Sequence, residues 1–391
     1  MGRPRSERRR KVVRALELTA LTLILTGIAA ALIFGNWVAA QARTIVVLST
    51  TNHTPVLTWA VKVVTDEPRA EEATIAGAPT TVVRPGGGKR WPAVVFVNGA
   101  TRAGRHHPDV QHLARGLARA GYVAFVPELP GLRLGEIGDR TVAGVVSVAR
   151  AVAARPDIRG RQVSLLGVSV GTTLALLAAE SPALAGKVRL VAGVAPYTSL
   201  RKVIRMSTTG TYAAGTTVIR YSTDPYVGLA VARSLVAALP PGHDRRVLRE
   251  ELEAVDDDDP DALAGLRRSP PAVRSPAGDA VVGLLANRDP RRFEMLYARL
   301  PPRSRAAIVR LSPLAVARRL EAPVLLASAP HDDYFPLQES RALAGAAEGT
   351  EVSVTTTTAL SHVLPDPSLG SIHDLLRFDG FAIRVLERAW A

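Results

Sequence analysis

Short, mainly apolar strands that alternate with longer helical segments restrict the fold of this chain more than any other feature. Each predicted strand is a run of β-branched and small apolar residues, and segments with helical periodicity lie between most of them. Parallel strands need crossover connections, usually helices, and a parallel sheet is covered on both faces. The alternation therefore predicts an α/β fold with a mostly parallel central sheet and helices on both faces. The predicted strands are 73–77, 80–85, 93–97, 122–131, 163–167, 188–196, 322–330 and 351–355, and the predicted helices are 107–121, 142–156, 169–180, 338–347 and 375–390.

The alternation is interrupted between about residues 201 and 310. This stretch carries charged, helix-like segments joined by prolines, and no strand of the parallel type is visible in it. The apolar run 227–239 contains Arg233 and is too short to cross a bilayer, so it is interpreted as an amphipathic helix. The acidic run 256–259 lacks the glycine and terminal glutamate of a calcium-binding EF-hand loop and is interpreted as a solvated helix junction. The predicted layout is a core over 71–200, a helical insertion over 201–310 and the rest of the core over 311–391.

The N-terminus carries a basic leader and then a long uncharged segment. Residues 1–14 contain seven arginines and lysines and one glutamate, and residues 18–40 carry no charge over 23 positions. Roughly 20 apolar residues span a bilayer as a helix, and basic residues before a span stay on the cytoplasmic side. Residues 15–40 are therefore predicted to be a single-pass transmembrane signal anchor, followed by a juxtamembrane segment 41–70, with the rest of the chain on the extracytoplasmic side. The alternatives are a signal peptide cleaved near Ala42, which would give a secreted protein, and a buried core helix.

Composition excludes several classes of chemistry. The 391 residues carry a net charge of +14 that is thinly spread outside the leader, so no nucleic-acid partner is expected. The chain has no cysteine, which excludes disulfides, cysteine-ligated metals and thiol nucleophiles. Neither a G-x-G-x-x-G nor a P-loop motif occurs. The adjacent His106 and His107, near His112, precede a predicted helix and would diverge rather than converge on one ion. The sequence thus predicts no cofactor and no metal.

The strongest local motif is the segment Gly167-Val168-Ser169-Val170-Gly171 between a predicted strand and a predicted helix. A sharp turn at this point pushes the serine hydroxyl out at the carboxyl end of the sheet, where a base can reach it. The turn crowds its neighbours, and both flanking positions are glycine. The amide groups at the start of the following helix favour developing negative charge. We interpret Ser169 as a candidate nucleophile, with Gly167 and Gly171 as the glycines of a nucleophile elbow.

A nucleophilic serine needs a histidine base, and the base needs a carboxylate that orients it. Of the eight histidines, His362 lies in a loop after the last predicted strand, whereas His373 heads a helix and is expected to cap it or to face solvent. Asp332 and Asp333 lie just after the predicted strand 322–330. We therefore interpret His362 as the base and one of these two aspartates as the acid.

A third requirement is an oxyanion hole, a pair of donors for the negative oxygen that forms during acyl transfer. The backbone amide after the nucleophile, that of Val170, is one candidate donor. The other is the amide of Ala100, in the loop that follows the predicted strand 93–97. Gly99 in this loop allows the backbone to approach a substrate closely.

From about residue 71 to its end, the chain resembles the α/β-hydrolase superfamily, in particular the dienelactone-hydrolase and prolyl-oligopeptidase-like serine hydrolases. The resemblance lies in VVFVNGA, GYVAFVPELPG, GVSVG, SPLAVARRLEAPVLLASAPHDDYFP and the later SHVLP. It implies an α/β-hydrolase fold with a triad of Ser169, Asp332 and His362, because the acid of this pattern lies four positions before a proline, here Pro336. Asp333 stays as the alternative acid. The superfamily carries its lid where this chain has the helical insertion.

Three functions are compatible with these residues. The first is a membrane-anchored serine hydrolase that cleaves a carboxylic ester or a related small acyl substrate through an acyl-enzyme intermediate, and the apolar helices of the insertion favour a lipophilic acyl group. The second is a peptidase or acyltransferase that uses the same triad. The third is a non-catalytic surface protein with this fold. All three predicted triad members are present, and this favours the first two over the third.

Overall fold

The computed structural model describes residue 39 and residues 41–47, 65–87, 90–215, 217–362, 364–365 and 371–391. The predicted leader and almost all of the predicted anchor lie outside these residues. Among the described helices, none combines the length and the apolar character that a bilayer span requires.

One eight-stranded sheet forms the centre of the molecule, with the strand order β1-β2-β4-β3-β5-β6-β9-β10. Strands β1, β2 and β4 pair antiparallel, and every other pair is parallel. The mostly parallel sheet predicted from the alternation is therefore confirmed. The strands are β1 (Arg69–Ile75), β2 (Ala78–Arg84), β3 (Trp91–Val97), β4 (Val123–Pro127), β5 (Ile158–Val168), β6 (Val188–Val194), β9 (Val324–Ser328) and β10 (Val352–Thr356).

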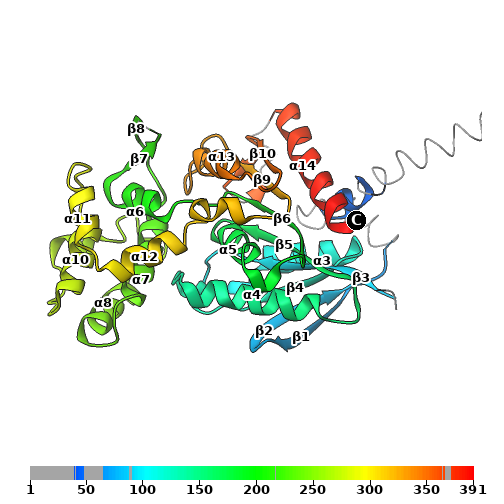
Figure 1. Cartoon of the computed structure of the whole chain (residues 1–391), viewed down its shortest axis with the longest axis horizontal. Coiled ribbons are helices and arrows are strands. Elements are labelled where there is room, and N and C mark those ends of the chain that lie inside the picture. The colour runs from blue at the N-terminus through cyan, green and yellow to red at the C-terminus, as the bar shows by residue number, and fades with distance from the viewer. Residues whose placement is uncertain are drawn as a thin grey trace, which may run out of the picture.

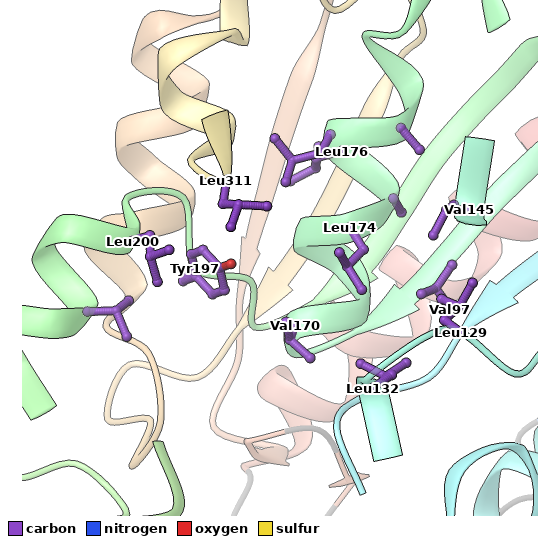
Figure 2. Close-up of a cluster of buried hydrophobic side chains, with 14 of the residues drawn as sticks. Val97, Leu129, Leu132, Val145, Val170, Leu174, Leu176, Tyr197, Leu200 and Leu311 are labelled. Atoms are coloured by element: carbon purple, nitrogen blue, oxygen red, sulfur yellow. The ribbon is translucent and has the colours of Figure 1, made fainter. Parts of the chain in front are cut away.

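Helices cover both faces of this sheet. Along β3 successive side chains point to opposite faces, so that Val95 and Val97 join one buried cluster while Val94 and Phe96 join the other. The first face packs against α4 (Asp139–Ala153), α5 (Val170–Ala179) and α13 (Leu337–Ala346), and the second against α3 (Pro108–Arg119) and α14 (Ile372–Trp390). Figure 2 shows part of the first cluster, in which Leu174 and Leu176 of α5 appear together with Val97 of β3.

A short helix before the sheet, residues 41–47, lies beside α14 (Figure 1). Val47 is buried in the same cluster as Phe381 and Leu386 of α14. The Arg43 guanidinium lies 3.7 Å from the centre of the Trp390 ring at the end of α14. The first part of the predicted juxtamembrane segment 41–70 is thus helical, over residues 41–47.

The helical insertion leaves the sheet after β6 and returns at β9, and its helices gather beyond one end of the sheet in Figure 1. The run 227–239 lies almost wholly within a helix, α7, as predicted. A two-stranded hairpin also occurs in this segment, and the sequence analysis missed it. The elements are α6 (Leu200–Thr209), β7 (Thr211–Ala214), β8 (Thr217–Arg220), α7 (Pro225–Ala237), α8 (His243–Glu253), α9 (Ala264–Arg268), α10 (Pro276–Leu285), α11 (Phe293–Arg299) and α12 (Pro302–Arg310).

Short elements complete the chain. The strands β11 (Leu360–Ser361) and β12 (Leu364–Pro365) form a small antiparallel pair just after β10. The 3₁₀ turns are η1 (Gly104–His106), η2 (Leu132–Leu134), η3 (Pro182–Leu184), η4 (Pro313–Ala315) and η5 (Ala317–Arg319).

A buried carboxylate ties the insertion to the core. Glu339 of α13 is fully buried, and its carboxylate accepts hydrogen bonds from the Thr198 amide at 2.7 Å and the Ser199 amide at 2.6 Å. It also accepts one from the Tyr212 hydroxyl of β7 at 2.6 Å. A buried charge is stable only when it is well paired or hydrogen-bonded. This contact therefore fixes both the entry to α6 and the hairpin against the sheet domain.

Close packing of α5 against the end of β3 explains the glycines of the elbow. A Cβ atom on Gly171 would lie 2.0 Å from the Val97 carbonyl oxygen and 2.6 Å from that of Asn98. A Cβ atom on Gly167 would lie 2.5 Å from the Thr172 amide nitrogen. Such distances are far below van der Waals contact, so that only glycine allows the helix to start this close to the strand.

Replacing Gly171 by alanine should lower the free energy of unfolding by about 3 kcal/mol, because the new methyl group must push α5 away from β3. Gly380, in α14, offers a matched control, since a Cβ atom there meets nothing within 4 Å. Gly380→Ala should raise the unfolding free energy by about 0.5 to 1 kcal/mol through helix propensity. Urea unfolding measures both changes, and equal effects of the two substitutions would contradict the packing argument.

Candidate active site

Ser169 occupies the sharp turn between β5 and α5, at the carboxyl end of the parallel strands. Strand β5 ends at Val168 and α5 begins at Val170, which leaves one residue to reverse the chain direction. Ser169 adopts φ 53° and ψ −128°, a conformation that costs of order 1 to 3 kcal/mol for a residue with a side chain. Its amide donates to the Val194 carbonyl oxygen of β6 at 2.8 Å. The predicted turn is therefore present, and its strain is held by the adjacent strand.

His362 and Asp332 lie next to each other, although 30 positions separate them in the chain. His362 Nδ1 is 2.9 Å from both carboxylate oxygens of Asp332. The Asp332 side chain is fully buried, whereas 12% of the His362 side chain is exposed. Asp332 Oδ1 also accepts hydrogen bonds from the amides of Tyr334 at 2.7 Å and Phe335 at 2.9 Å. Four short contacts thus hold the carboxylate, and a proton on His362 Nδ1 leaves Nε2 as the acceptor.

Asp333, the alternative acid, lies in a different environment. Asp333 is exposed to solvent. Its backbone carbonyl accepts hydrogen bonds from the Asp224 amide at 2.7 Å and from the Thr223 hydroxyl at 3.1 Å. The Tyr221 hydroxyl donates to the backbone carbonyl of Asp332. The loop that carries both aspartates is therefore bound by residues of the helical insertion, and Asp332 is the one whose carboxylate contacts the imidazole.

Aromatic rings fix the plane of the imidazole. The Tyr334 ring stacks on His362 with 4.0 Å between ring centres and an interplanar angle of 16°. Phe335 approaches it edge-on at 6.0 Å. Burial, with the nearby Asp224 carboxylate, raises the pKa of the Tyr334 phenol well above its usual range, so this ring stays neutral. The contact of Tyr334 was not predicted from the sequence, and its place two residues after Asp332 was the available signal.

The loop after β3 lies against the serine. A Cβ atom on Gly99 would be 3.7 Å from Ser169 Cβ, and Gly99 and Ala100 line the same cavity as Ser169. The Asn98 side chain donates to the Gly99 carbonyl oxygen at 2.8 Å. The Tyr226 hydroxyl of α7 donates to the Ala100 carbonyl oxygen at 3.3 Å. Val170 is the first residue of α5, and the first amides of a helix have no partner within it. Both predicted donor residues therefore border the serine.

An ion-pair network links this loop to the insertion. Arg102 donates to Asp257 at 2.7 and 3.1 Å, and Arg233 of α7 donates to the same carboxylate at 2.7 Å. Burial raises the pKa of Asp257, but hydrogen bonds from both arginines and their charges hold it below its usual value overall. Asp257 belongs to the acidic run 256–259, which the sequence analysis interpreted as a solvated junction. The structure instead gives one of its carboxylates two cationic partners.

A cavity of about 530 Å³ opens beside these groups, and Ser169, His362, Gly99 and Ala100 line it. Most of the remaining lining side chains are aliphatic or aromatic. Among the described residues, no group of three or more histidines, aspartates or glutamates is placed to hold a metal ion. His107, one of the adjacent histidines in the sequence, caps α3: its Nδ1 accepts a hydrogen bond from the Asp109 amide at 3.3 Å. The site combines a hydroxyl, an imidazole–carboxylate pair and backbone amides around an apolar cavity. Acyl transfer needs groups of these kinds as nucleophile, base and oxyanion donors.

Three solved structures show partial similarity. Against the Pyrococcus horikoshii acylaminoacyl peptidase the identity is 13% and the TM-score 0.43, with 76% of this chain and 38% of that chain covered. A Mycobacterium tuberculosis puromycin-hydrolyzing peptidase has 17% identity and a TM-score of 0.44, with 82% of this chain and 37% of that chain covered. An esterase, rPPE, in complex with (S)-Ac-CPA has 15% identity and a TM-score of 0.44, with 90% of this chain and 97% of that chain covered. This chain thus spans less than two fifths of the length of either peptidase.

No curated protein matches the sequence. The sequence profile of the alpha/beta hydrolase family does match it, over residues 94–369. That range begins inside β3 and includes Ser169, Asp332 and His362 as well as the whole insertion. The match covers well over half of the chain, and the sheet described above has the corresponding mostly parallel architecture. The protein is a member of the alpha/beta hydrolase family.

Proposed function

We propose that this protein is a serine hydrolase that cleaves a carboxylic ester or a related acyl substrate. The observation that carries the proposal is the His362–Asp332 pair, with Nδ1 2.9 Å from both carboxylate oxygens, in a cavity that Ser169 also lines. The strained backbone at Ser169 supports it, because strain of this kind collects at functional turns.

In the proposed reaction the Ser169 hydroxyl oxygen attacks the substrate carbonyl while His362 Nε2 accepts the hydroxyl proton. The amides of Val170 and Ala100 donate to the oxyanion of the tetrahedral intermediate. His362 then gives the proton to the departing alkoxide, so that the alcohol leaves and an acyl-enzyme forms. Water, activated by the same imidazole, hydrolyses the acyl-enzyme and restores Ser169. Asp332 orients the imidazole and stabilises its charged form throughout.

A peptidase or acyltransferase would use the same three residues. A peptidase would release an amine in place of an alcohol, and an acyltransferase would pass the acyl group to an acceptor other than water. The mainly apolar lining of the cavity favours an ester with hydrocarbon substituents over a peptide, whose amide groups need polar partners. This observation ranks ester hydrolysis first.

We also propose that residues 15–40 anchor the protein in the membrane and place residues 71–391 on the extracytoplasmic side. Support comes from the 23 uncharged positions and the basic leader before them.

A fluorophosphonate probe, which reacts with activated serines, should label the wild-type protein and fail to label Ser169→Ala, because the hydroxyl at residue 169 is the proposed nucleophile. The label should stay with membranes after an alkaline carbonate wash, because residues 15–40 are the proposed anchor. Gel fluorescence of the separated fractions measures both. Equal labelling of Ser169→Ala would reject the nucleophile, and labelled full-length protein in the wash would reject the anchor; the two failures are distinct.

Asp332→Asn should reduce kcat/KM for a p-nitrophenyl ester by about 10⁴-fold, because the amide can donate to Nδ1 and so favours the wrong imidazole tautomer. Asp333→Asn makes the same chemical change one position later and should leave kcat/KM within about threefold of wild type, since that side chain lies at the surface. Steady-state kinetics at neutral pH compares the two. A larger loss from Asp333→Asn would reassign the acid.

Asp257 is proposed to position the oxyanion loop through Arg102. Asp257→Asn should lower kcat about tenfold with KM little changed, a fraction of the loss that follows removal of one whole oxyanion donor. Asp258→Asn, a neighbouring exposed residue of the same acidic run, is the control for charge and should leave kcat unchanged. If Asp257→Asn raised KM and left kcat intact, the network would serve binding and not the oxyanion loop.

A further inference from the structure

The cavity beside Ser169 connects two hydrophobic clusters that lie on opposite faces of the sheet. Some of its lining residues belong to the cluster around α4, α5 and the insertion, and others to the cluster around α3 and α14. The two neighbours of Ser169 divide between these sets, because Val170 belongs to the first cluster and Val168 packs against the second. The cavity is therefore lined by two apolar sets of side chains, one on each side of the proposed reaction centre, and each side is here called an arm.

The first arm, here called the insertion arm, lies against α6 and α7. Its walls are aliphatic side chains from these helices, with Phe335 from the acid loop: Leu200, Val203, Val227, Ala230, Val231 and Phe335. Of the polar groups on this side, Ser234 donates to the Ala230 carbonyl at 2.7 Å and accepts from the Ile137 amide at 2.9 Å. The buried hydroxyl of Tyr197, which also lines the cavity, has no hydrogen-bond partner among the described residues.

The second arm, the α14 arm, lies between α3 and α14 over the other face of the sheet. Its walls come from these two helices, from β5 and β6, and from the short helix 41–47: Val47, Val110, Leu166, Ala192, Phe381 and Ala382. The polar residues of this arm are Thr44 of the short helix and His107 and Asp109 at the start of α3, where His107 Nδ1 lies 3.7 Å from the Asp109 carboxylate. An ester chain in this arm would thus meet hydrocarbon over most of its length.

Protein interiors are packed almost without voids, and the few voids larger than a water molecule cost stability. A cavity of about 530 Å³ that joins two cores is within the size range of small-molecule sites. An arm on one side only would suit an apolar acyl group with a small leaving alcohol. Two arms that meet at the serine suit a substrate with apolar groups on both sides of the scissile bond.

We propose that the natural substrate is a carboxylic ester with a hydrocarbon chain on its acyl side and a second hydrocarbon group on its alcohol side, each bound in one arm. This inference rests on the proposed function. The carbonyl lies at Ser169 between the arms, the acyl chain stays in its arm as the acyl-enzyme, and the alcohol leaves through the other.

Two series of esters test the proposal. In the first, the ethyl esters of linear acids increase from two to ten carbons on the acyl side; in the second, the acetates of linear alcohols increase over the same range. Burial of one methylene contributes about 0.8 kcal/mol, which corresponds to roughly fourfold in kcat/KM. We expect kcat/KM to rise along both series by up to this factor per carbon until each arm is full, as measured by titration of the released acid.

A matched pair of substitutions assigns each arm to one side of the ester. Ala230 of α7 and Ala382 of α14 are both half-buried helical alanines, and they line different arms. Ala230→Phe should abolish the rise along one series and retain it along the other, and Ala382→Phe should do the reverse. Ala298→Phe, at an exposed helical alanine of α11, should change neither series.

The reciprocal pattern also shows that both variants are folded, and leucine at the same two positions serves where phenylalanine prevents folding. A rise along one series alone, or an effect of both substitutions on the same series, would overturn the two-armed substrate. Higher kcat/KM for N-acyl peptides than for two-chain esters would also overturn it. Absence of hydrolysis across both series, together with absence of fluorophosphonate labelling, would instead reject the proposed hydrolase itself.

Discussion

The close approach of α5 to the end of β3 is the constraint on which the candidate site depends. With a Cβ on Gly171 only 2.0 Å from the Val97 carbonyl oxygen, no residue other than glycine allows this contact. Because the helix starts here, Ser169 must reverse the chain in one step and takes up its strained conformation. The same contact places the first amide of α5 beside the loop after β3. The close packing at Gly171 thus determines the conformation of Ser169 and the position of the Val170 amide, one candidate oxyanion donor. It also brings both next to the loop that carries Ala100, the other candidate donor.

Several donors converge on each of the two buried carboxylates near the candidate site, and the two show different uses of this arrangement. Asp332 receives two backbone amides and the imidazole, so its charge is both satisfied and directed at His362. Glu339 receives two amides and a tyrosine hydroxyl, and its charge joins the insertion to α13. Replacement of either by an apolar residue would strand several buried donors, which generally costs more than the loss of one hydrogen bond.

The sequence predicted the sheet and the elbow because both leave local signals. Strands buried on both faces have a distinctive apolar pattern, and the turn at Ser169 demands small residues two positions before and after it. It also pointed to His362 and to the pair Asp332–Asp333 by their positions after strands. The contacts of Tyr334, Tyr226 and Asp257 were beyond its reach, because each depends on how the insertion folds back over the sheet. The hairpin β7–β8 was missed although Gly210 and Gly215 bracket its first strand, since the charged helical segments around it dominated the pattern.

These missed contacts change how the insertion is to be understood. Tyr221 and Asp224 bind the loop that carries Asp332, while Tyr226 and Asp257 bind the loop that carries Ala100. A cover that only shielded the cavity would need apolar contacts with its rim and no fixed polar contacts with the loops of the reaction centre. Here the insertion contributes hydrogen bonds to both loops and an ion pair to the loop that carries Ala100, so its position and the geometry of the candidate site cannot vary independently. The α14 arm has a different wall, built from α3, α14 and the helix 41–47, so the cavity of the candidate site also contacts the part of the chain nearest the predicted anchor.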